Sequence, residues 1–194
     1  MKLLHIDSSA LGAYSVSREL SAAIVDAWKR RKPGLEVTYR DLAANPLPHW
    51  TPVADAADPA ALVGQAALEE FLSADVVVIG APMYNFGVPS SLKAWIDRIV
   101  IAGKTFRYSA TGVEGLAGGR KVMIASARGG FYGDDSGRAN FDFQEDYLRH
   151  VFGFIGVTDI EFVRAEGIGL GPEQKAKAVN DAHAEIQARQ PIAA

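Results

Sequence analysis

The sequence contains no cysteine among its 194 residues. This absence excludes disulfide bonds, thiolate metal sites, iron–sulfur clusters and a cysteine nucleophile. The sequence also lacks a long hydrophobic run, since the longest, Val76 to Met83, has eight residues and includes Gly80 and Pro82. A helix that crosses a bilayer needs roughly 20 apolar residues, so no membrane span is expected.

Basic residues are too few for a nucleic-acid-binding protein. There are 20 Lys and Arg against 23 Asp and Glu, a net charge of −3, whereas binding to a phosphate backbone requires a basic surface. No charged leader followed by an apolar stretch is found, because Met1-Lys2-Leu3 runs directly into strand-like sequence. The composition, 48% hydrophobic and 22% charged, predicts one globular domain over residues 1–194, located in the cytoplasm.

Strand-like and helix-like segments alternate along the chain. Five segments are expected to be strands: Leu3–Ile6, Glu36–Tyr39, Val76–Ile79, Lys121–Ala125 and Ile160–Val163. Helical periodicity is found over Leu20–Trp28, Pro59–Leu72, Leu92–Val100, Phe143–Phe154 and Pro172–Arg189. In the first of these helices, Arg18, Lys29 and Arg30 are expected on the side opposite the apolar residues. The alternation predicts an α/β fold, with a parallel sheet and helices on both faces.

Two connections are longer than most loops in compact α/β domains. They are Ala43–Asp58 and Gly129–Asp142. Long loops in such domains are frequently functional, so both are expected to form lids or walls of a binding site.

Four serines lie in the loop that follows the first predicted strand. This loop contains Asp7-Ser8-Ser9 and ends with Ser15-Val16-Ser17, where the first helix is expected to begin. Free backbone N–H groups and the helix dipole stabilise a phosphate dianion at such a position, and hydroxyls donate further hydrogen bonds. A simple helix cap would use only one serine, at position 15 or 17. Because four hydroxyls exceed that need, phosphate binding is the favoured interpretation.

Other signatures of catalysis or nucleotide binding are missing. No G-x-G-x-x-G follows the first strand and no G-x-x-x-x-G-K-[ST] occurs, which argues against a Rossmann dinucleotide site and a P-loop. The G-x-S-x-G elbow of hydrolases is also absent. The four histidines are too scattered for a metal site, and Asp134-Asp135 is more simply a solvated loop tip. We therefore predict no metal and name no catalytic acid, base or nucleophile.

Two further strand ends have unusual sequences. After the third strand, Met83-Tyr84-Asn85-Phe86 combines apolar surface with an amide that both donates and accepts, as the edge of a heteroaromatic ring requires. A well-packed loop with buried aromatics would have the same composition. After the fourth strand, Ala127-Arg128-Gly129-Gly130 permits close approach to the backbone, although Gly-Gly is also a common turn. A phosphate site, a planar wall and glycine amides together match FMN, which binds at this edge in flavodoxin-like folds.

At these motifs the sequence resembles a known family, the FMN-dependent NADH:quinone oxidoreductases, also called FMN-dependent NADH-azoreductases. The likeness extends along nearly the whole chain, and its specificity comes from the order and spacing of short markers. These are Ser8-Ser9 with Ser15-x-Ser17, Arg40-Asp41-Leu42-Ala43-Ala44-Asn45-Pro46, Ala81-Pro82-Met83-Tyr84-Asn85-Phe86, Thr105-Phe106-Arg107-Tyr108, Arg128-Gly129-Gly130, Gly153-Phe154-Ile155-Gly156 and Ala165-Glu166-Gly167.

The resemblance implies a flavodoxin-like three-layer fold, with a five-stranded parallel sheet of order 2-1-3-4-5. It also implies a homodimer with two active sites near the interface and tightly, noncovalently bound FMN. The residues implied for the phosphate are Ser9, Ser15, Val16 and Ser17; for one side of the isoalloxazine, Met83, Tyr84, Asn85 and Phe86; for its pyrimidine end, Ala127, Arg128, Gly129 and Gly130; for a stacked planar substrate, Phe86, Tyr108 and Phe154. Val16 stands where the family often has a glutamine, and Ala127 where it often has a serine, so each position loses a side-chain hydrogen bond.

The expected reaction is a two-electron, ping-pong transfer. NADH or NADPH would donate a hydride to flavin N5, and a quinone or aromatic azo compound would then accept the electrons. Amides of Gly129 and Gly130 near N1 and O2 would stabilise the reduced ring. Two other functions stay open from the residues alone. One is a flavodoxin-type one-electron carrier, although such carriers are usually strongly acidic and the net charge here is only −3. The other is a flavin-free regulatory domain on the same fold.

Overall fold

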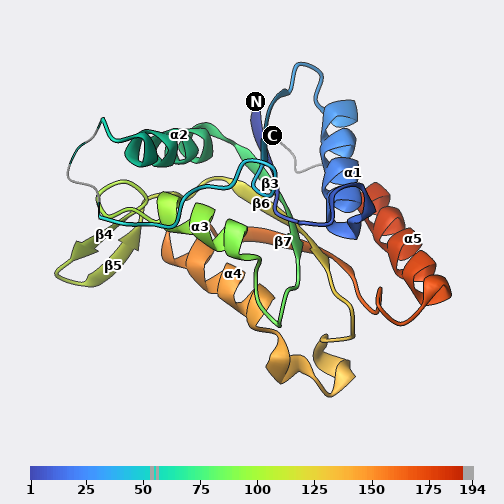
Figure 1. Ribbon diagram of the computed structural model, residues 1–194. Coiled ribbons are helices and arrows are strands. Elements are labelled where there is room, and N and C mark those ends of the chain that lie inside the picture. Colours follow the sequence, from blue (N-terminus) through green and yellow to red (C-terminus); the bar gives the residue numbers. More distant parts are fainter. Residues whose placement is uncertain (53–54, 56, 190–194) are drawn as a thin grey trace.

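The computed structural model describes residues 1–52, 55 and 57–189 and shows a three-layer α/β arrangement (Figure 1). Its central sheet is parallel, with the order β2-β1-β3-β6-β7 among the described residues. These strands are β1 (Lys2–Asp7), β2 (Glu36–Asp41), β3 (Val76–Pro82), β6 (Lys121–Ala127) and β7 (Asp159–Ala165). Counted within the sheet alone this is 2-1-3-4-5, so the predicted fold class and strand order are confirmed.

Helices cover both faces of the sheet. In the described part of the chain they are α1 (Val16–Arg31), α2 (Pro59–Ser73), α3 (Ser90–Ile99), α4 (Phe143–Phe154) and α5 (Pro172–Ala188). Helices α1 and α5 pack on one face, and α2, α3 and α4 on the other (Figure 1). No helix in the residues described is long and apolar enough to cross a membrane.

Strand β3 is buried along its whole length, as its unbroken apolar sequence predicts. Because side chains alternate along a strand, Val76 and Val78 join the core under α1 and α5, whereas Val77 and Ile79 join the core under α2, α3 and α4. The central strand is therefore held from both sides, which fixes the position of the loop that follows it.

A β-hairpin that the sequence patterns did not predict lies outside the central sheet. It consists of β4 (Phe106–Ser109) and β5 (Gly112–Gly115), which are four residues each and mostly exposed. Its contact with the rest of the molecule depends on glycine: a Cβ at Gly115 would lie 2.2 Å from the backbone nitrogen of Gly156. The hairpin thus packs against the end of α4 through this backbone contact and through Phe106, whose ring lies 4.7 Å from that of Phe154.

The two long connections predicted to form lids or walls are the loops 43–58 and 129–142, and only the second is described along its whole length. Residues 53, 54 and 56 of the loop 43–58 lie outside the described residues. The loop 129–142 contains two short 3₁₀ segments, η2 (Asp134–Ser136) and η3 (Ala139–Phe141), and leads into α4, whose N-cap is Asp142. This second loop is therefore partly regular.

Candidate functional site

The loops after β1, β3 and β6 meet at one edge of the sheet. These three strands are neighbours and all run parallel, so their carboxyl ends lie side by side. In open α/β sheets this edge is where ligands bind. The three loops are the ones that the sequence singled out.

The loop after β1 ends at the N-terminus of α1. Ser15 is the N-cap and accepts a hydrogen bond from the Arg18 amide at 3.3 Å, and its hydroxyl lies 3.1 Å from that of Ser17. The amides of Val16 and Ser17 donate to no acceptor among the described residues. Ser15 is thus a helix cap, and the two amides beside it are available to an anion.

Ser8 and Ser9 have different roles in that loop. The Ser8 hydroxyl donates to the Gly80 carbonyl at 2.7 Å, so it links β1 to β3 and is not available to a ligand. The Ser9 hydroxyl accepts from the Leu11 amide and lies 3.3 Å from the hydroxyl of Tyr84. Of the four serines that suggested a phosphate site, Ser8 is therefore structural, and Ser9, Ser15 and Ser17 border the available amides.

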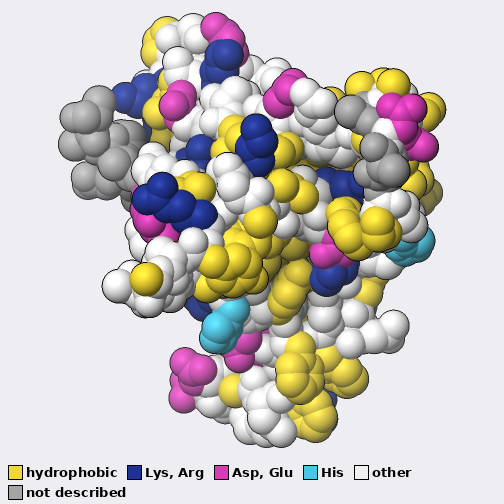
Figure 2. Space-filling model, turned by 90° about the vertical axis from the view of Figure 1, so that its left-hand side faces the viewer, with side chains coloured by type: hydrophobic (Ala, Val, Ile, Leu, Met, Phe, Trp, Pro, Cys, Tyr) yellow, Lys and Arg dark blue, Asp and Glu magenta, His cyan; other side chains and the backbone are white. Residues whose placement is uncertain are grey.

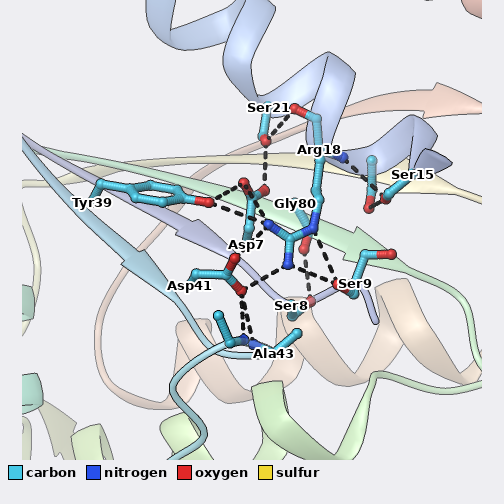
Figure 3. A network of polar contacts seen from close by, with 12 residues as sticks. Asp7, Ser8, Ser9, Ser15, Arg18, Ser21, Tyr39, Asp41, Ala43 and Gly80 are labelled. Atoms are coloured by element: carbon cyan, nitrogen blue, oxygen red, sulfur yellow. Dashed lines mark hydrogen bonds and ion pairs between the residues drawn. The ribbon is translucent and has the colours of Figure 1, made fainter. Parts of the chain in front are cut away.

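Arg18 fixes the position of this loop (Figure 3). Its Nε and Nη2 donate to the Ser9 carbonyl at 3.1 and 2.8 Å, and both Nη atoms donate to the Asp41 carboxylate at 2.7 Å. Asp41 in turn accepts from the amides of Ala43 and Ala44. Of the three basic residues expected on the side of α1 opposite its apolar residues, Lys29 and Arg30 are exposed, whereas the Arg18 side chain is only 16% exposed and joins α1, the Ser9 loop and the end of β2.

A buried carboxylate lies directly beneath this arrangement. Asp7 accepts from the hydroxyls of Ser21 at 2.7 Å and Tyr39 at 3.0 Å, and Arg18 is 3.7 Å away (Figure 3). Burial first, and then the Asp7 carboxylate, raise the pKa of Tyr39 to about 12, so its hydroxyl stays protonated and donates. A Cβ on Gly80 would lie 2.4 Å from Asp7 Oδ1, so only glycine fits there.

The Arg18–Asp41 pair makes stability depend on pH. The hydrogen bond from Arg18 lowers the pKa of Asp41 from 3.8 to about 2. A carboxyl whose pKa is lower in the folded state stabilises the fold fully above its unfolded pKa, and loses that contribution as pH falls through the folded value. We expect the difference in unfolding free energy between wild type and Asp41→Asn to shrink by about 1 kcal/mol from pH 5.5 to pH 2.5. Urea unfolding at both pH values measures it, and a constant difference would contradict the assignment.

The loop after β3 makes a tight turn. Tyr84 and Gly87 exchange two backbone hydrogen bonds at 3.0 Å, and the two residues between them have positive φ, 49° for Asn85 and 70° for Phe86. This conformation costs energy for a non-glycine residue, and such strain is frequently found at functional sites. Tyr84 Oη accepts from the Ala10 amide at 3.1 Å, which links this turn to the loop after β1. The amide of Met83 donates to Ala127, so the turn is also attached to β6.

The loop after β6 offers backbone amides and not the Arg128 side chain. Carbonyls of Arg128, Gly129 and Gly130 accept hydrogen bonds from the segment 167–169, whereas the amides of both glycines donate to no described residue. The Arg128 side chain is fully buried and points into the protein, where it pairs with Asp142 at 2.8 Å, Glu166 at 3.3 Å and Glu145. Its part at the site is to hold the glycine loop. Ala127, the last residue of β6, is also buried.

The aromatic residues expected to stack a substrate fall into two clusters. Phe86 lies 5.4 Å from Phe141 and 6.1 Å from Tyr132, measured between ring centroids. Tyr108 and Phe154 both pack on Phe106, at 5.5 and 4.7 Å. No ring contact among the described residues joins the two clusters. Tyr132 and Phe141, which the sequence did not single out, thus belong to the Phe86 side of the site.

An apolar pocket of about 870 Å³ lies next to the turn after β3, between it and α4. Its lining residues are Tyr84, Asn85, Gly87, Val88, Ser90, Lys93, Phe143, Asp146, Tyr147 and His150. Figure 2 shows this side of the molecule, where hydrophobic side chains gather in its central and lower parts. The pocket has the size of a site for a small organic molecule. The fold and these loops define a flavodoxin-like α/β protein, with a sheet edge suited to a phosphorylated, planar ligand.

Comparisons with known proteins agree with this class. The family model described as flavodoxin-like fold matches residues 1–189. A protein from Xanthomonas axonopodis pv. citri (strain 306), named FMN-dependent NADH:quinone oxidoreductase 1, is 59% identical over 184 residues, which cover 94% of this chain and 93% of that protein. A relative from Methylocella silvestris, named FMN-dependent NADH:quinone oxidoreductase, is 55% identical and covers 94% of this chain and 95% of its own length. The chain belongs to the family of FMN-dependent NADH:quinone oxidoreductases.

Two solved structures extend the comparison. The azoreductase from Bacillus anthracis str. Sterne superposes with a TM-score of 0.87 at 29% identity, covering 96% of both chains. An FMN-dependent NADH-azoreductase from Bacillus anthracis str. Ames Ancestor, solved in complex with FMN, has a TM-score of 0.84 at 25% identity and covers 96% of this chain and 97% of its own. The resemblance stated from the motifs is therefore confirmed.

Proposed function

We propose that this protein is an FMN-dependent NAD(P)H oxidoreductase that reduces quinones and aromatic azo compounds. The observation that best supports this is the presence of available backbone amides on both sides of the strained turn after β3. Val16 and Ser17 supply them after β1, and Gly129 and Gly130 after β6. This arrangement fits a ligand with a phosphate at one end and a hydrogen-bonding ring at the other, and the relatives are named for FMN.

The phosphate end of the site relies on backbone more than on side chains. The amides of Val16 and Ser17 and the positive end of the α1 dipole favour a dianion. Ser9, Ser15 and Ser17 add hydroxyls, and Arg18 holds the Ser9 carbonyl by a hydrogen bond of 2.8 Å. The replacement of a glutamine by Val16 therefore removes a side-chain donor and leaves the main-chain donor in place.

When bound, FMN would supply two-electron chemistry between NADH or NADPH and a quinone or azo compound, with hydride transfer through N5. The chain's own contribution is to bind and orient. The amides of Gly129 and Gly130 stabilise negative charge near N1 and O2, as preorganised donors do wherever charge develops. The turn with positive φ at Asn85 and Phe86 would offer an amide and an aromatic ring to the same edge of the flavin. We name no side-chain acid or base.

We propose further that the protein is a homodimer and acts in the cytoplasm, where NADH and NADPH are available. Within one chain, Tyr108 and Phe154 belong to a different aromatic cluster from Phe86. A second copy that covers the apolar face between α3 and α4 would bring the hairpin of one chain toward the turn of the other. Equilibrium ultracentrifugation checks the oligomeric state.

A visible absorption scan tests the proposed function. The purified protein is expected to show a flavin spectrum that bleaches rapidly on anaerobic addition of NADH. With NADH and a quinone varied together, parallel double-reciprocal plots are expected, and intersecting plots would contradict alternate binding. A flavin spectrum unchanged by either coenzyme would indicate a one-electron carrier. Failure to bind added FMN would refute the cofactor assignment.

A Gly129→Ala variant tests the amides of the loop after β6. An added Cβ at Gly129 meets nothing within 4 Å, so the apoprotein is expected to fold and melt as wild type does. The methyl group would nevertheless hold a flavin away from the backbone, and we expect FMN affinity to fall at least about tenfold. Gly153→Ala in α4 is the matched control, because its Cβ also meets nothing within 4 Å and lies away from the loop. Equal FMN affinity in both variants, by fluorescence titration, would refute the role.

A further inference from the structure

A second cavity lies on the face of the sheet that α2, α3 and α4 cover, away from the loops after β1, β3 and β6. It has a volume of about 430 Å³ and lies between α2 and the end of α3. Its walls are mainly apolar, formed by one side of α2 together with Trp50 and Ile101. The lining residues are Trp50, Ala61, Gly64, Gln65, Leu68, Glu69, Leu72, Arg98, Ile101 and Lys104. None of them belongs to the loops after β1, β3 or β6.

Arg98 is the unusual group in this cavity. It is only 6% exposed, and among the described residues no carboxylate lies within ion-pairing distance of it. Its Nη2 donates to the carbonyls of Pro48 at 3.2 Å and His49 at 3.1 Å, but its buried Nε has no partner among the described residues. Burying a cation without a counter-charge is costly, so a guanidinium in this state favours an anion beside it.

Nη1 is the part of the Arg98 guanidinium that is left for an anion, because no described residue accepts a hydrogen bond from it and it is not among the fully buried atoms. The guanidinium lies against α2 at Gly64, where an added Cβ would be 3.1 Å from Arg98 Cδ and 3.3 Å from Nη1. Glu69, the one acidic side chain among the described lining residues, accepts a hydrogen bond from Gln65 at 2.7 Å and does not pair with Arg98. Lys104 adds a second positive charge, so the lining as a whole is positive.

We propose that this cavity binds a small organic carboxylate with an apolar body, and that Arg98 is its counter-charge. A carboxylate oxygen can accept a charge-assisted hydrogen bond from Nη1, and the apolar walls favour an organic anion over a small inorganic ion. Leu68, Leu72 and Trp50 provide the surface for the apolar body. The proposal is independent of the flavin site and concerns a second ligand.

The test uses the FMN-loaded protein and two probes of the same shape, 3-phenylpropanoate and its uncharged amide. We expect the carboxylate to bind with a roughly millimolar dissociation constant and the amide at least about tenfold more weakly. Indole N–H resonances locate the probe, because the protein has three tryptophans and only Trp50 lines the cavity. A shift of the Trp50 resonance alone supports the proposal.

Variants distinguish a binding site from a structural role of Arg98. Arg98→Met is expected to abolish the preference for the carboxylate, whereas Arg30→Met on the exposed side of α1 is expected to keep it. Equal binding of acid and amide to wild type, or unchanged acid binding to Arg98→Met, would overturn the proposal. No binding to wild type, or a probe that perturbs the flavin absorption band and not Trp50, would overturn it as well. If Arg98→Met fails to fold, the acid–amide comparison on wild type still decides.

Discussion

An Arg128→Met variant is expected to lose about 3–5 kcal/mol of unfolding free energy, the largest effect of one substitution that we expect in this protein. The Arg128 side chain is fully buried and pairs with Asp142, Glu145 and Glu166, whose side chains are 4–19% exposed. Methionine fills a similar length but leaves three carboxylates without their common cation. Urea unfolding of the apoprotein measures the loss.

The same variant is expected to weaken FMN binding, because Arg128 stabilises the loop that contains the glycine amides. Glu166 accepts from the Tyr132 amide at 2.8 Å, and Asp142 caps α4 at the other end of the loop 129–142. Arg164→Met is the control, since Arg164 pairs only with Glu145 among the described residues and its side chain is 45% exposed. It is expected to cost about 1 kcal/mol or less. Equal losses in the two variants would contradict the role given to Arg128.

Most of the fold could be predicted because it follows from hydrophobic periodicity. The run Val76–Ile79, apolar at every position, predicts a strand covered on both faces, and the helix over Leu92–Val100 shows its apolar side plainly. The β4–β5 hairpin has no such pattern. It is short and mostly exposed, and it packs through one buried ring, Phe106 on Phe154, and through the close approach of Gly115 to Gly156, neither of which a periodic pattern reveals.

The candidate site was predictable in its loops but not in its charged residues. The serines and the Gly129-Gly130 pair stand next to strand ends, where sequence position alone indicates a role. Arg18 has the spacing of a solvent-facing residue, and nothing in a helical period indicates a pair with Asp41, which lies 23 positions away. The family resemblance implies Arg128 at the pyrimidine end of the flavin, but its side chain is buried inside the protein. Its burial depends on Asp142, Glu145 and Glu166, which converge only in the folded chain.

An Arg18→Met variant is expected to lower FMN affinity about 10- to 100-fold while the protein remains folded. Arg18 gives two hydrogen bonds to the Ser9 carbonyl and two to Asp41 (Figure 3), and hydrogen bonds from a charged donor fix geometry more strongly than neutral ones do. Without them the Ser9 loop is no longer fixed against the N-terminus of α1. Fluorescence titration of the apoprotein with FMN measures the change, with Arg30→Met on the same helix as the control that should bind as wild type does.

A double-mutant cycle tests whether Arg18 and Asp41 act together to hold the Ser9 loop, an arrangement called a clamp here, or contribute to FMN binding independently. If Arg18 acts on the phosphate loop only while Asp41 holds it, then Asp41→Asn weakens FMN binding too, and the double variant is no weaker than Arg18→Met alone. Additive losses would show that Arg18 instead contacts the phosphate directly as a charge. That outcome would also predict a stronger dependence of FMN affinity on salt in wild type than in Arg18→Met, because an exposed ion pair is screened. The geometry favours the clamp, since the hydrogen bonds of Arg18 are directed to Ser9 and Asp41.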